Sequence, residues 1–187
     1  VPSEVHNASL LGAALLARLH TYSVIRGMDY NEPSPRPSPI GWERVARHAG
    51  EVRGTVSSVP PTSPSGSSED FRSAAVAATS YALKRQRPDG SWPYGEGAKQ
   101  RWIDSFHTGF NLMALEKARE CLGMDECEPA IRKGYAFYLD HFFESDGRAK
   151  YFHDRTYPID AHSIAQALVT LTGLASYDDR SLSVAAK

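Results

Sequence analysis

The chain has 187 residues and a formal net charge of −1, from 21 basic and 22 acidic side chains. This length suits one domain with a real core, and the near-neutral balance has no basic stripe of the kind that binds nucleic acid or an anionic membrane surface. The longest apolar run, residues 9–17, is too short to cross a bilayer, and Cys121 and Cys127 are too few for a disulfide framework. We therefore predict a cytoplasmic protein with no nucleic-acid partner and no integral membrane segment.

The first element expected is a helix over residues 7–22 (NASLLGAALLARLHTY), which is apolar nearly all round, as in a helix buried on every side. Residues 28–68 then lose all helical and strand periodicity and are rich in proline and serine. The predicted organisation is a first inner helix within residues 1–27, a disordered insertion at 28–68, and helical hairpins of the same domain at 69–187.

The insertion contains the phrase PSPRPSPIGWER, which resembles translated intergenic repeat DNA of some bacterial genomes. A segment of this composition buries too little apolar surface to offset the entropy lost on ordering. We interpret it as a passenger in an older helical hairpin; the alternative is a proline-rich ligand for an SH3-like partner.

Four further segments have helical periodicity. Residues 69–85 and 129–143 each have one apolar stripe and one charged face, which is typical of outer helices. Residues 105–121 and 161–175 are apolar at most positions, which is typical of inner helices buried on every side. Buried helices are therefore expected to alternate with amphipathic ones.

The stretches that follow the two outer helices repeat each other. Asp89-Gly90 matches Asp146-Gly147, and Ile103-Asp104 matches Ile159-Asp160. Residues 6–16 (HNASLLGAALL) form a third, partial copy. A unit of about 55 residues that holds two helices indicates a repeat architecture, in which each Asp-Gly turn ends an outer helix before the chain crosses to an inner one.

Residues 86–92 (QRPDGSW) match the QxxxGxW signature of terpenoid cyclases and prenyltransferase repeats. That resemblance implies an α/α toroid of inner and outer helices. The fold class predicted is all-α, as a partial α/α toroid of about three hairpins. We expect the chain to be the C-terminal part of a longer toroid, or one shortened by insertion, and to self-associate through its open inner faces.

The segment DSFHTGFNLMAL is similar to the part of protein-prenyltransferase β subunits in which a histidine binds zinc, which implies the ligand position for His107. The other ligands of that family come from an Asp-x-Cys pair at an earlier inner helix, where this chain has His6-Asn7-Ala8-Ser9. The DxDD motif of squalene cyclases is also missing. We therefore predict no metal site and no cofactor; the alternative left open is a divalent metal bound through Asp and His side chains.

The stretches PYGE, WIDSFHTGF and YFHDRTYPIDAHS resemble toroid proteins of bacterial exopolysaccharide biosynthesis clusters. In a toroid, the residues before each inner helix gather at one mouth of the central cavity. The candidate catalytic residues there are Asp104, His107, Asp160 and His162. The candidate substrate-binding residues on the connectors are Tyr94, Glu96, Arg101, Trp102, His153, Arg155 and Tyr157.

Each candidate also has a structural interpretation. Asp104 and Asp160 directly precede helices, so they can serve as N-caps, and His107 can be a core histidine held by Asp104. His162 lies only two residues after Asp160, so this pair does not share a helical face. Trp92 is expected to pack the turn against the helix ends.

The predicted function is a carbohydrate-active protein of bacterial polysaccharide biosynthesis that acts on or binds an acidic or phosphate-linked sugar. Helix N-termini and the nearby Arg101 and Arg155 suit an anionic group, and the Asp and His side chains suit the acid–base chemistry of a sugar hydrolase, lyase or epimerase. Two alternatives stay open: a zinc-dependent or cyclase-like prenyl or terpenoid enzyme, and a non-catalytic helical scaffold or degenerate fragment.

Overall fold

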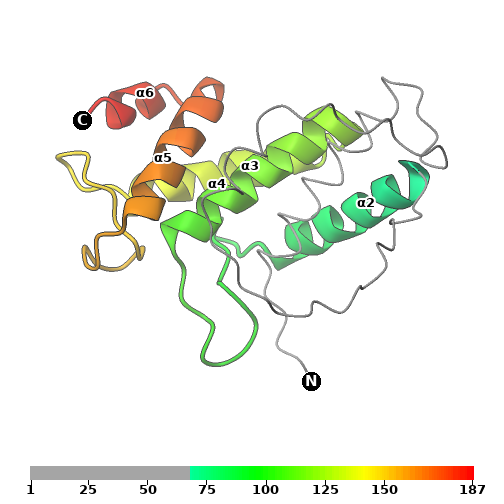
Figure 1. Ribbon diagram of the computed structural model, residues 1–187, viewed down its shortest axis with the longest axis horizontal. Helices are drawn as coiled ribbons and strands as arrows, with labels where there is room; N and C mark the ends of the chain where they lie inside the picture. The colour runs from blue at the N-terminus through cyan, green and yellow to red at the C-terminus, as the bar shows by residue number, and fades with distance from the viewer. Residues whose placement is uncertain (1–67) are drawn as a thin grey trace, which may run out of the picture.

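The structure, a computed structural model, describes residues 68–187; the helix predicted at 7–22 and the proline-rich segment that precedes α2 lie outside the described residues. The described part is all-α (Figure 1). Of its helices, none has both the length and the apolar character needed to span a bilayer. The elements are α2 (Ser68–Arg85), α3 (Ser105–Leu122), α4 (Cys127–His141), α5 (Ala161–Gly173), the 3-10 helix η3 (Ala175–Tyr177) and α6 (Arg180–Ala185).

Helix α3 lies at the centre of the described structure, in contact with α2, α4 and α5 (Figure 1). Most of its residues are buried, whether apolar, such as Leu112 and Leu115, or polar. It begins after the N-cap Asp104 and ends at Gly123, whose φ of 68° is the left-handed conformation that favours a residue without a Cβ. The predicted pattern of a buried α3 between the more exposed α2 and α4 is confirmed, whereas the toroid arrangement stays a prediction.

The QRPDGSW turn joins α2 to α4 through its three signature residues. The Gln86 side chain donates hydrogen bonds to the carbonyl oxygens of Gly90 (3.0 Å) and of Ala130 on α4 (2.8 Å). Gly90 has a φ of 94°, and a Cβ there would lie 2.4 Å from the Lys133 carbonyl oxygen. Trp92 is buried, and its Nε1 donates to the Ala82 carbonyl oxygen (3.0 Å). The structural interpretation of Trp92 is therefore confirmed.

Two long connectors, residues 86–104 between α2 and α3 and residues 142–160 between α4 and α5, run antiparallel beside each other where they pair. This pairing positions the start of α3. The Ser105 backbone N–H donates to the Tyr151 carbonyl oxygen (2.8 Å), and the His153 N–H donates to the Ile103 carbonyl oxygen (3.3 Å). An isolated β-bridge also joins Asp104 to Phe152. In Figure 1, α3 and α5 both begin at the same end of the molecule, next to these connectors.

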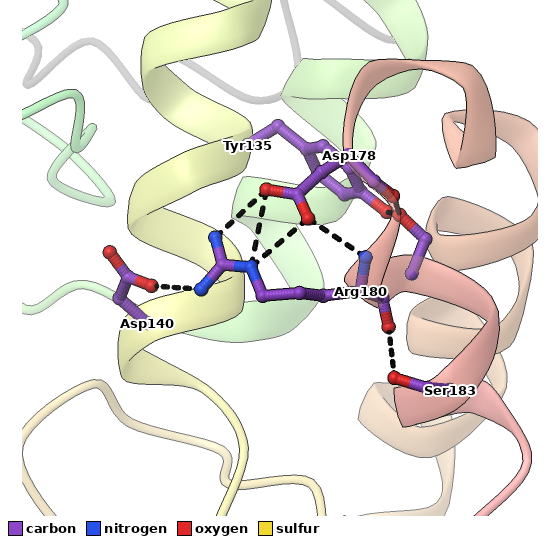
Figure 2. A network of polar contacts seen from close by, with 6 residues as sticks. Tyr135, Asp140, Asp178, Arg180 and Ser183 are labelled. Atoms are coloured by element: carbon purple, nitrogen blue, oxygen red, sulfur yellow. Dashed lines mark hydrogen bonds and ion pairs between the residues drawn. The ribbon is translucent and has the colours of Figure 1, made fainter.

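The C-terminal α6 packs on α5 and is tied to α4 by polar contacts that the sequence did not predict. The Tyr135 hydroxyl donates to Ser181 Oγ at 2.7 Å. Arg180 donates to Asp178 at 2.9 Å and to Asp140 on α4 at 2.7 Å (Figure 2). The hydrogen bond from Arg180 holds the pKa of Asp178 below its usual value. These contacts fix the last helix against the preceding hairpin.

The prediction that the last inner helix is buried on every side was wrong for the described structure. Three polar residues of α5, Ser163, Gln166 and Thr170, face the interior, while much of its apolar surface is exposed. The polar side chains tolerate burial because they bond locally: Gln166 Nε2 donates to Thr170 Oγ1, and Thr170 Oγ1 donates to the Gln166 carbonyl oxygen. Gly109 of α3 allows this close approach, since a Cβ there would lie 2.7 Å from Thr170 Oγ1.

Candidate functional site

Among the predicted site residues, Asp104 and His107 form the pair with the most hydrogen bonds. Asp104 is 1% exposed and has the extended backbone of an N-cap, with Oδ1 accepting the His107 backbone N–H at 2.8 Å. The same carboxylate contacts His107 Nδ1 through both oxygens, at 2.8 and 2.9 Å. Trp102 Nε1 donates to Oδ2 at 3.2 Å. One buried carboxylate therefore caps the helix and fixes two ring side chains.

This geometry assigns the histidine tautomer. A carboxylate accepts hydrogen bonds and has none to donate, so Nδ1 of His107 carries the hydrogen that points to Asp104. In the neutral form of the ring, Nε2 is then the nitrogen that keeps a lone pair. The His107 side chain is 26% exposed while that of Asp104 is fully buried. The buried Asp104 carboxylate thus orients the partly exposed imidazole of His107.

Aromatic rings surround the imidazole. Tyr94 stacks on Trp102, with ring centroids 4.6 Å apart and planes 17° from parallel. Tyr94 also meets His107 edge to face at 4.8 Å, and Phe106 meets it at 5.2 Å and 90°. Such contacts restrain the ring planes and lower the local polarity. The candidate site, defined here as Tyr94, Trp102, Asp104, Phe106 and His107, therefore combines one proton-transfer group with a rigid aromatic wall.

Asp160 and His162 lie at the start of α5 and form a looser pair. Asp160 Oδ2 accepts the Ser163 backbone N–H at 2.8 Å and its hydroxyl at 3.1 Å. His162 Nδ1 is 3.5 Å from Asp160 Oδ1, and the His162 side chain is 83% exposed. The backbone hydrogen bond from Ser163 holds the pKa of Asp160 below its usual value. Asp160 therefore acts as a helix cap, as its structural interpretation predicted.

The two capped helix starts nevertheless belong to one end of the molecule. The Phe106 and His162 rings lie 6.3 Å apart, so the first turns of α3 and α5 are neighbours. Burial raises the pKa of Tyr151, and the charges of Asp104 and then Asp160 raise it further. Tyr151 thus lies within electrostatic reach of both carboxylates. Asp104 and Asp160 therefore lie at the same end of the described structure, whereas the central cavity of a toroid stays a prediction.

Some of the predicted connector residues contact the Asp104–His107 pair, and others have contacts elsewhere. Tyr94 contacts the His107 ring, and Trp102 binds Asp104. Arg101, the residue before Trp102, is exposed. Glu96 pairs with Arg85 of α2 at 2.6 Å, so it serves the connector's attachment to that helix. Tyr157 is exposed near the end of the second connector.

His153 and Arg155 stabilise the second connector. His153 Nδ1 is 3.3 Å from the Ile103 carbonyl oxygen, and its ring packs on Phe137 with a centroid distance of 6.1 Å. The Arg155 guanidinium lies 4.2 Å from the centroid of the Phe152 ring, a cation–π contact. Both side chains therefore have structural contacts within their own connector or its partner.

Phe106 is the residue of the site that the sequence did not single out. It belongs to the apolar stripe of α3 with Phe110, which indicated only a core position. The two rings meet at 4.8 Å, and both are half-buried. The signal available was its place directly before His107, on the first turn of an inner helix.

Within residues 68–187, no three His, Cys, Asp or Glu side chains are arranged so that they could hold a metal ion. Cys127 opens α4 and is buried, and burial raises the pKa of its thiol to about 12. Cys127 follows the end of α3, whereas His107 lies on the first turn of α3, so an 18-residue helix separates the two. The stretch Asp125-Glu126-Cys127 has the letters of an Asp-x-Cys pair, but it therefore does not lie beside His107, as the prenyltransferase resemblance implies for that pair.

No protein-family model, curated protein sequence or solved structure matches the chain. The resemblance to toroid enzymes stays a prediction from the sequence motifs.

Proposed function

We propose that this chain is a carbohydrate-active protein of bacterial polysaccharide biosynthesis, which binds an acidic or phosphate-linked sugar at the start of α3 and transfers a proton through His107. The observation that carries the proposal is the Asp104–His107 pair. A fully buried carboxylate holds Nδ1 of a partly exposed imidazole from 2.8 Å and leaves Nε2 for a ligand.

The chemistry follows from that arrangement. An imidazole oriented by a buried carboxylate accepts a proton at Nε2, and the negative charge of Asp104 stabilises the imidazolium that forms. Donation from the same atom reverses the step. Proton removal from a sugar carbon next to a carboxylate, or from a sugar hydroxyl, needs one such group, and removal from that carbon is the first step of epimerase- and lyase-type reactions.

The aromatic wall supplies a surface for the sugar. Trp102 is partly exposed, its ring is held by Tyr94 on one side, and its Nε1 is bound to Asp104. Rigid rings of this kind offer the C–H face of a sugar an apolar contact at small entropic cost. Arg101, one residue earlier on the same connector, is an exposed cation for a carboxylate or phosphate of the ligand.

Thermal-shift and calorimetric measurements on the full chain with uronic acids, nucleotide sugars and polyprenyl phosphates test binding. We expect at least one acidic sugar to raise the melting temperature in a concentration-dependent manner. Failure of the whole panel to bind would reject the proposal. Stabilisation by polyprenyl phosphates alone would favour the prenyl-enzyme alternative.

His107→Asn then separates binding from proton transfer. The asparagine amide can take the place of Nδ1–H beside Asp104 but has no counterpart of Nε2. We expect unchanged affinity and melting temperature, and a loss of turnover of about 100-fold or more, measured as product by mass spectrometry. His141→Asn, at an exposed position on α4, is the matched control. Equal turnover in both variants would remove His107 from the chemistry.

A non-catalytic scaffold is the second candidate, and a specific observation favours it. Asp104 and Asp160 both accept the backbone N–H three residues later, so capping alone accounts for an aspartate at each position. A scaffold predicts that His107→Asn changes neither ligand binding nor turnover, because there is none to change.

A further inference from the structure

Helix α5 exposes an uncharged, largely apolar face. The residues on this face are Ala161, Ile164, Ala165, Leu168, Val169 and Thr172. They recur at intervals of three and four, so they form one continuous stripe on the helix. Leu168 is 47% exposed and Val169 is 53% exposed, which is unusual for large aliphatic residues that share a face. Further exposed aliphatic side chains flank it, Ile159 before the helix and Leu182 on α6.

We call this exposed stripe of α5 the ridge. A hollow of about 380 Å³ lies directly beside the ridge, between α5, α6 and the turn after α4. Ile164 and Leu168 of the ridge form one of its walls. Its other apolar walls come from Phe143, Leu171 and Val184. The ridge and the hollow therefore belong to one continuous apolar surface.

We propose that this surface binds a second copy of the chain, in a closed dimer with twofold symmetry. A twofold interface joins the same patch of two molecules, so the patch must be complementary to itself. A patch that contains a ridge beside a hollow meets this condition, since the Leu168 ridge of each copy can enter the hollow of the other.

The absence of charged side chains on the ridge is also compatible with a second copy. The ridge bears no Asp, Glu, Lys or Arg, so two ridges can meet without the burial of an unpaired charge. At the polar end of the hollow, Arg148 is already paired with Asp146 at 3.0 Å, and the Lys187 ammonium donates to the Ser145 carbonyl oxygen at 3.1 Å. The charges of Asp146 and Arg148 therefore cancel each other, while Lys187 keeps one positive charge at this end of the hollow.

The position of α5 in the repeat gives an independent reason. In stacked repeats the apolar face of each unit is covered by a neighbouring unit. Helix α3 has neighbours on several sides, whereas α5 keeps its polar residues inside and its apolar ones outside. A second copy would cover this face as the next repeat would. A helix of 13 residues is about 20 Å long, so the interface falls at the small end of specific interfaces and the dimer is weak.

Sedimentation equilibrium of the full chain, from low micromolar to hundreds of micromolar, tests the proposal. We expect a monomer–dimer equilibrium, and we expect Leu168→Glu to weaken it by at least about tenfold, because it places a charge in the interface. Since Leu168 is exposed, this variant should keep its helix content and melting temperature. Ala136→Glu, which adds the same charge at an exposed position of α4, is the matched control and should dimerise normally.

A second variant tests the symmetry. Leu168→Lys should also weaken the dimer. Mixing it with Leu168→Glu should restore a dimer, because Leu168 lines the hollow that residue 168 of the other copy enters, so the opposite charges meet. A chain that stays monomeric, that grows into open oligomers, or whose dimer survives Leu168→Glu would overturn the proposal. So would a monomer in which a Leu168→Cys thiol is shielded from maleimide, a result that would indicate cover by residues 7–22 of the same chain.

Discussion

The two aspartates that begin α3 and α5 occupy equivalent places in the repeat but have different surroundings. Asp104 is fully buried and receives hydrogen bonds from the His107 backbone, the His107 ring and the Trp102 ring. Asp160 is partly exposed and receives its bonds from Ser163. The spacing of the histidines explains part of the difference, since His107 lies three residues after its aspartate and on the same face, whereas His162 lies only two residues after.

Alanine at these two positions should therefore have unequal effects on stability. Asp160→Ala removes a cap and should lower the free energy of unfolding by about 1 kcal/mol. Asp104→Ala removes a cap and also takes the acceptor from the ring N–H groups of His107 and Trp102, which are partly exposed, so we expect a larger loss of about 2–3 kcal/mol. Urea unfolding of both variants measures the difference. Equal losses would mean that the contacts of Asp104 with the His107 and Trp102 rings add nothing to the free energy of unfolding beyond capping.

The lowered pKa of Asp160 predicts a dependence of stability on pH. A carboxyl group whose pKa is lower in the folded state stabilises the protein above its unfolded pKa of about 3.9, and this contribution is lost as the pH falls through the folded value. In Asp160→Asn the stability should therefore fall less steeply below about pH 4 than in the wild type. Urea titrations at a series of acidic pH values provide the comparison, and parallel curves would contradict it.

At the scale of elements, the QRPDGSW turn is the part of the fold best predicted from sequence. Its glutamine, glycine and tryptophan each have a contact that only that residue type supplies, and all three lead to α4 or the end of α2. Gly134 on α4 completes the arrangement, because a Cβ there would lie 2.6 Å from the Trp92 ring. A glycine in the middle of a helix thus has a packing role.

This contact predicts a change of sign in a double-mutant cycle. In the wild type, Gly134→Ala should lower the free energy of unfolding by about 2 kcal/mol, because overpacking outweighs the gain in helix propensity. In a Trp92→Leu background the clash is gone, and the same substitution should stabilise the protein by about 1 kcal/mol. Thermal and urea unfolding of the four proteins measure both values. A stabilising effect in the wild type would contradict the packing.

The whole molecule shows where sequence reasoning reached its limit. Helix periodicity identified α2, α3, α4 and α5, and the repeat placed Asp104 and Asp160 at equivalent positions. Periodicity reports which residues are apolar but not which side of a helix has a neighbour, so the open inner faces were expected but the particular exposed face of α5 was not. The contacts of Glu96 with α2 and of His153 with Ile103 were likewise not predictable, because they depend on how connectors far apart in sequence meet.

The antiparallel pairing of the connectors has a consequence for the newly made chain. The Ser105 N–H and the Ile103 carbonyl oxygen, on either side of Asp104, take their partners from Tyr151 and His153. A ribosome-bound chain that has not yet released residue 153 lacks those partners, even when all of α3 has emerged. The backbone on either side of Asp104 therefore gains these partners only after residues 151–153 have left the exit tunnel.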